Sequence, residues 1–222
     1  MAATRISFLA PRAEVRRWLV VSGTIATAML VGVAVLATIR QHDGPSGFSS
    51  GLLDPDGSWS GVAEILKANG LVLALHFFAA SAGAIIGRGE RDASGTRTMT
   101  SRFGTETMPA WVERAALAWA LGATLLSVAA QTWRLGGILA DLAAQVGHAP
   151  VLVLLCVLPH ALPELCAVFL PLGLFLVQAR RDDLAPLVGW IWHALLLAAP
   201  ALVLCALVEE WLSRPLLQAL LT

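Results

Sequence analysis

The chain has 222 residues, of which 57% are hydrophobic and 14% are charged, and its mean hydropathy is +0.74. This composition is unlike that of a soluble globular domain and indicates an integral membrane protein. The 15 basic and 15 acidic residues cancel, so the net charge gives no basis for binding nucleic acid or an acidic substrate.

The first predicted element is a membrane span at residues 18–39, a run without any charged side chain. Such a run is long enough to cross a hydrocarbon core about 30 Å thick. It exceeds the apolar stretch of about 7–15 residues that is usual in a secretory signal peptide. We therefore expect an uncleaved anchor, preceded by a cytoplasmic segment at residues 1–17.

Two further spans are predicted at about residues 64–86 and 115–133, separated by polar segments. Residues 41–61 are rich in glycine, serine and aspartate, as in an extramembrane loop. Residues 87–111 form a second loop, which cannot lie in lipid because it is rich in charge. Its arginines are Arg88, Arg91, Arg97 and Arg102.

Residues 136–158 contain too many apolar side chains for a loop, but Gly147, Pro150 and Pro159 interrupt them. Helices between such breaks would be too short to cross a bilayer. We expect a re-entrant or interfacial helical pair here, followed by a fourth span at 161–180 and a fifth at 188–208.

The predicted fold is all-α, a polytopic membrane helix bundle of about five transmembrane helices with one re-entrant or interfacial broken-helix segment. It forms a single domain over residues 18–217, followed by a tail at 218–222. Basic residues are concentrated in residues 1–17, in the 87–111 loop and just after residue 179. By the positive-inside rule, this predicts a multi-pass protein of the cell (inner) membrane with a cytoplasmic amino terminus and an outside carboxyl terminus.

The stretch VLPHALPELCAVF at residues 157–169 places Pro159, His160, Pro163 and Glu164 in apolar surroundings. Buried carboxylates are costly in a membrane unless they lie near an interface or in a protein-lined recess. We expect His160 and Glu164, which share a helix face, at the outer end of the fourth span. Glu209 ends the fifth span, so these residues are predicted to share one outward-facing niche. Either a mutually satisfied polar pair or a binding niche would explain them.

The run LPHALPELCAVFLPLGLFL resembles the signature of the bacterial stage II sporulation protein M family. Members of that family have a proline–histidine pair, a glutamate four residues after the histidine, and then a helix rich in small residues. Pro159, His160, Glu164 and Leu165 match this pattern, with Ala161 where the family usually has glycine.

Two other patches carry the same resemblance in the same order. ILKANGLVLALHFFAASAGAIIG is similar to the family's second span, and Asn69 stands at the place of its asparagine. ALVEEWLSRPLL is similar to the final span, with Glu209 and Pro215 at the matching glutamate and proline.

This resemblance implies a membrane scaffold that organises envelope or cell-wall-remodelling partners, in the way the family does during sporulation. The implied partners are proteins of the cell-wall hydrolase type, besides the lipid bilayer. An alternative is the membrane subunit of a transporter with a separate ATP-binding subunit, because broken helices with polar ends build many substrate sites. Self-association into a homo-oligomer stays open, and no nucleic acid is expected.

Sequence motifs give little support for catalysis or metal binding. The sequence contains no HExxH, no phosphate-binding GxxxxGK[ST] and no dinucleotide-binding GxGxxG, and its one GxSxG match, GFSSG at residues 47–51, lies in the glycine- and serine-rich 41–61 loop. Its three cysteines have no CxxC spacing. We therefore expect neither enzymatic activity nor a cofactor, and the spacing of histidines and carboxylates along the chain predicts no metal site.

Overall fold

The computed structural model describes residues 10–40, 57–87, 90–91, 97–101, 104–107, 110–181 and 187–219. Helices form most of this part of the chain. In order, they are α1 (Arg12–Arg40), α2 (Trp59–Gly87), α3 (Ala110–Val146), α4 (Pro150–Val168), α5 (Leu170–Ala179), α6 (Leu187–Val208), the π-helical turn η1 (Glu209–Ser213) and α7 (Arg214–Ala219).

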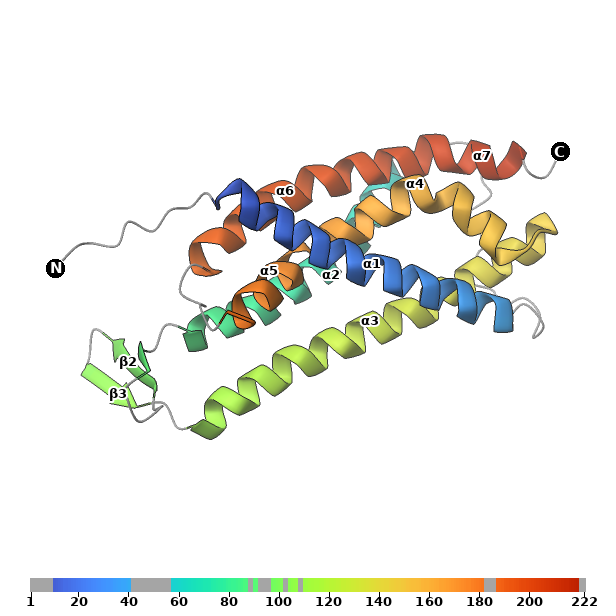
Figure 1. Cartoon of the computed structure of the whole chain (residues 1–222). Helices are drawn as coiled ribbons and strands as arrows, with labels where there is room; N and C mark the ends of the chain where they lie inside the picture. The colour runs from blue at the N-terminus through green and yellow to red at the C-terminus, as the bar shows by residue number, and fades with distance from the viewer. Residues whose placement is uncertain are drawn as a thin grey trace.

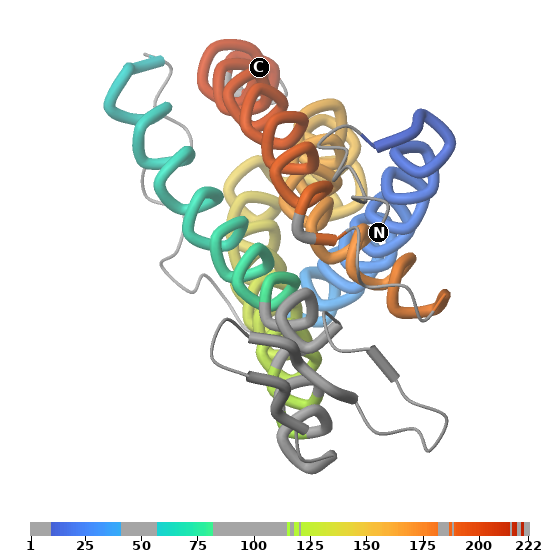
Figure 2. Tube along the Cα trace, turned by 90° about the vertical axis from the view of Figure 1, so that its left-hand side faces the viewer, coloured from blue at the N-terminus to red at the C-terminus, as the bar shows by residue number. Residues whose placement is uncertain are grey.

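The helices run along a common long axis, and α5 continues α4 in the same general direction (Figure 1). Helix α1 begins and α7 ends at opposite ends of the bundle (Figure 1). Seen from the end, α1 and α2 lie on opposite sides, with α4 and α6 between them (Figure 2). The centre of the bundle is mostly apolar, and its fully buried side chains include Trp18, Phe169, Leu170 and Leu174.

Four helical segments of the described chain are long and apolar enough to cross a membrane. They are Arg12–Arg40, Trp59–Ser81, Pro150–Val168 and Gly189–Ser213. Large apolar side chains such as Leu71, Phe78, Leu126 and Leu196 are exposed on the outer faces of the bundle. The predicted class, a polytopic helical membrane protein, is confirmed at this level, whereas the number of crossings stays a prediction.

The boundaries around the predicted broken pair differ from the expectation. Helix α3 continues without interruption through Gly136 to Val146, where we expected a separate short helix. It then ends at Gly147, which has a positive φ of 68° that suits glycine. Helix α4 begins at Pro150. Proline suits this position because the N–H groups of the first helical turn have no partner within the helix.

The predicted break at Pro159 is wrong, because α4 runs through both Pro159 and Pro163. These two prolines are exposed on one face of the helix, four positions apart. The helix instead breaks at Phe169, where Pro171 has no N–H to offer the carbonyl of the preceding turn. Beside this break, the Ser22 hydroxyl of α1 lies 2.8 Å from the carbonyl oxygen of Trp18 in its own helix and 3.1 Å from that of Phe169, which also accepts the Gly173 N–H.

A small antiparallel sheet in the 87–111 loop adds to the predicted all-α fold. Its strands, β1 (Glu90–Arg91), β2 (Arg97–Ser101) and β3 (Gly104–Thr107), pair in the order β1-β2-β3. Thr98 pairs with Thr107 and Thr100 with Thr105. β-Branched threonine favours strands. The threonines of this arginine-rich loop were therefore a signal for strands that the all-α prediction did not include.

Candidate functional site

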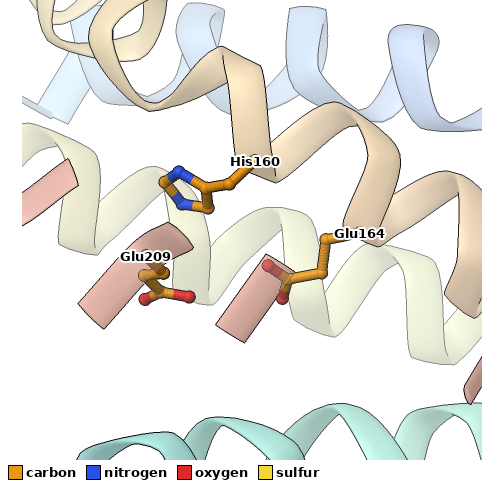
Figure 3. Close-up of side chains that lie close together, drawn as sticks. All are labelled: His160, Glu164 and Glu209. Carbon is orange, nitrogen blue, oxygen red and sulfur yellow. The ribbon is translucent and has the colours of Figure 1, made fainter. Parts of the chain in front are cut away.

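Three ionisable side chains meet between α4 and η1. His160 and Glu164 extend from α4, and Glu209 is the first residue of η1. One imidazole nitrogen and one oxygen from each carboxylate all lie within 4.8 Å of one another. The imidazole and both carboxylates face a common space (Figure 3). We call these three residues the polar cluster.

His160 is held by a serine on the facing segment. Its imidazole is 6% exposed, and its Nδ1 lies 2.7 Å from Oγ of Ser213, the last residue of η1. A π-helical turn widens the helix locally and is frequent at functional sites. Pro215, which follows directly, cannot donate a backbone hydrogen bond to the preceding turn, so the sequence accounts for an irregular helix at this point.

Glu164 is bound from a third direction, by α2. The side-chain amide of Asn69 donates a hydrogen bond of 2.5 Å to Oε1 of Glu164. The cluster thus connects α2, α4 and η1. Each of the two α4 residues has its own partner on another element, in place of the direct histidine–glutamate hydrogen bond that their spacing allowed.

Glu210, the neighbour of Glu209, caps the amino terminus of α2. Its Oε1 accepts the backbone N–H of Ser58 at 2.8 Å, while the Ser58 hydroxyl accepts the N–H of Gly61 at 3.0 Å. This is the arrangement of a capping box, with the carboxylate supplied from η1. Gly61 occupies the helix position that normally provides the carboxylate, and a Cβ there would collide with the Glu210 side chain.

A cavity of about 160 Å³ adjoins the polar cluster. His160, Glu164, Glu209 and Ser213 form its polar part. Leucine and valine side chains of α1, α3 and α4 line the rest, among them Leu30, Val33, Leu135, Leu139, Leu142 and Leu154. The cluster therefore borders a mostly apolar space inside the bundle.

The structure brings together four of the predicted site residues, Asn69, His160, Glu164 and Glu209. Pro159 and Pro163 lie on the exposed face of α4, and Pro215 is exposed in α7. Ser213 was not among the predicted site residues. Its spacing of four from Glu209, on a shared helix face, was the available signal.

The position of the cluster along α4 is a correction. We expected His160 and Glu164 in the first turns of a span that starts at residue 161. Because α4 begins at Pro150, both residues lie well inside the helix. Glu209 does follow the end of α6, as predicted. The two helices are offset along their axes, so the interior of one meets the end of the other.

The fold and the site together define a polytopic helical membrane protein with a cluster of one buried histidine and two half-buried glutamates beside a mostly apolar cavity. No protein-family model, no curated protein and no solved structure matches the chain.

Proposed function

We propose that this protein is an integral membrane scaffold, similar to the stage II sporulation protein M family, which organises envelope or cell-wall-remodelling partners. One observation carries the proposal. Asn69, His160, Glu164 and Glu209, which carry the sequence resemblance from three separate patches, meet in one cluster. Residues matched by chance would be scattered over the fold. Motif residues that are distant in the chain but adjacent in the fold support a shared role.

A scaffold needs a fixed arrangement of helices, and the polar contacts of this bundle supply it. Side-chain hydrogen bonds between membrane helices contribute about 0.6–2 kcal/mol each. The contacts of Asn69 with Glu164, of Ser213 with His160 and of Ser58 with Glu210 connect α2, α4 and η1. They hold the helices in one register without closing the outer faces, which remain free for protein partners.

The side chains at the two ends of the bundle support an orientation in the inner membrane with the amino terminus on the cytoplasmic side. At the end where α1 begins, Arg16, Arg17, Arg180 and Arg181 surround a shallow hollow. At the opposite end, Arg40 lies over the ring of Trp133 at 4.7 Å, and Trp59 contacts Trp211 at 4.8 Å. Arginine-rich ends face the cytoplasm and tryptophans gather at membrane interfaces.

A second candidate function is that of a membrane subunit in a transporter. The cavity beside the polar cluster and the break between α4 and α5 favour it. Discontinuous helices with polar residues inside a bundle form the substrate sites of many transporters. In that case a separate ATP-binding subunit would supply the energy.

Purification of the tagged full chain from its native membrane, with identification of the co-purifying proteins, distinguishes the two functions. The scaffold function predicts enrichment of cell-wall hydrolases or other envelope-remodelling proteins, and the Glu164→Ala variant should recover less of them. The exposed Glu64→Ala variant on α2 is the matched control. An ATP-binding protein as the principal partner would reject the scaffold in favour of the transporter subunit.

A further inference from the structure

We propose that His160, Glu164 and Glu209 bind one divalent transition-metal ion of the zinc type inside the helix bundle. This goes beyond the scaffold function and does not depend on it. Metal-binding sequence motifs have ligands that are close along the chain. Here two ligands come from α4 and the third from η1, so only the fold brings them together.

The ligand set suits such an ion in charge and in chemistry. One imidazole with two carboxylates is a combination that Zn²⁺ and related divalent ions accept, whereas Mg²⁺ and Ca²⁺ prefer oxygen ligands alone. Two carboxylates placed close together in a medium of low dielectric constant repel each other. A divalent cation offsets both negative charges and converts this repulsion into attraction.

The distances leave room for an ion after small side-chain movements. A tetrahedral Zn²⁺ with bonds of about 2.0–2.2 Å separates its ligand atoms by about 3.4 Å. In the structure the three candidate ligand atoms already lie within 4.8 Å of one another. Glutamate side chains rotate about three bonds, so the two carboxylates can close the remaining difference without movement of the helices.

The neighbours of the ligands provide an independent indication. Metal-binding histidines almost always hydrogen-bond through their second ring nitrogen, and ligating carboxylates are similarly oriented. Ser213 lies against Nδ1 of His160, and when Nδ1 carries the proton, Nε2 keeps a lone pair for the metal. Asn69 binds Oε1 of Glu164, which leaves Oε2 for the metal. Both contacts orient ligands toward the common space.

The adjoining cavity leaves a coordination position open. It is lined by all three ligands and by Ser213, and its volume of about 160 Å³ is larger than that of a water molecule. Three protein ligands with a water in the fourth position is a common zinc arrangement. The site therefore has space for a bound water or a small polar ligand next to the ion.

Metal binding by the purified full chain tests the proposal. After removal of metal with a chelator, the protein in detergent is titrated with Zn²⁺, and the bound ion is quantified by calorimetry and elemental analysis. We expect one ion per chain. Glu164→Gln and Glu209→Gln should each weaken binding at least about 100-fold, because the loss of a ligand exceeds the effect of its supporting contacts. Glu64→Gln, which removes an exposed carboxylate from α2, is the control and should bind as the unmodified chain does.

The contacts behind the ligands give a second, graded measurement. Ser213→Ala and Asn69→Ala should lower the Zn²⁺ affinity by about 10–100-fold. Titration of the unmodified chain with Co²⁺ requires no variant and should give intense visible absorption bands of a tetrahedral site. The absence of stoichiometric Zn²⁺, an affinity unchanged by both glutamine variants, or a Co²⁺ spectrum identical to that of the aqueous ion would each overturn the proposal.

Discussion

Single side chains decide how the polar cluster is built, and Ser213 is the one whose role the sequence did not indicate. Its hydroxyl is buried and lies 2.7 Å from Nδ1 of His160. Ser213→Ala leaves a buried imidazole nitrogen without this partner, which costs about 1–2 kcal/mol. We expect a lower melting temperature of the metal-free protein in detergent.

Thr24→Ala is the control for this change. Thr24 is exposed, and its hydroxyl donates a hydrogen bond to the carbonyl of Val20 in its own helix. This hydrogen bond does not connect two helices. We expect a change within about 0.5 kcal/mol. If Ser213→Ala is no more destabilising than Thr24→Ala, the hydrogen bond to His160 does not stabilise the bundle.

At the scale of elements, the contact between α1 and α5 depends on a glycine. A Cβ at Gly173 would meet the Ser22 hydroxyl and lie 2.8 Å from the carbonyl oxygen of Trp18. Gly173→Ala should therefore push α1 and α5 apart and destabilise the protein by about 1–3 kcal/mol. Gly23 lies next to Ser22 in α1 and has nothing within 4 Å of a built Cβ, so Gly23→Ala should leave stability unchanged or raise it slightly. Equal melting temperatures for the two variants would contradict the packing seen between these helices.

The helix boundaries show which parts of the fold the sequence could predict. The long apolar runs were sufficient for α1, α2 and α6, because length and hydropathy depend only on local composition. The prolines of α4 were misleading, since a proline ring on the outer face of a membrane helix is tolerated when tertiary contacts hold the helix. Pro171 breaks the helix instead, at a point where Ser22 of α1 binds the Phe169 carbonyl. No pattern within one segment reveals such a contact.

The candidate site was predictable to a similar extent. The rarity of His160, Glu164 and Glu209 in apolar sequence marked them individually, and the resemblance added Asn69. Their hydrogen-bond partners depend on how α2, α4 and η1 pack. The cap of α2 depends on the same packing, because Gly61 of α2 leaves the space that the Glu210 carboxylate of η1 occupies. A metal site made in this way has no sequence motif.

For the whole molecule, the distribution of arginine predicts a topology that reporter fusions can measure. Residues 41–58 connect α1 to α2, and residues 88–109 connect α2 to α3. Because the two connections lie at opposite ends of α2, fusions in them should report opposite sides of the membrane, with the second on the cytoplasmic side. The same side for both would contradict the orientation of α2 as a crossing helix.

The central structural feature of this protein is the meeting of α2, α4 and η1 at the polar cluster. Cross-linking tests it most directly, in the full chain with Cys156, Cys166 and Cys205 replaced by alanine. In this background we predict that Asn69→Cys paired with Glu164→Cys, and Glu164→Cys paired with Glu209→Cys, react within one chain with a short bifunctional thiol reagent in native membranes. Glu64→Cys paired with Glu164→Cys, which uses an exposed position on the same α2 helix, should not. Cross-linking of the control pair alone, or of none of the pairs although each cysteine reacts singly after detergent treatment, would contradict the cluster.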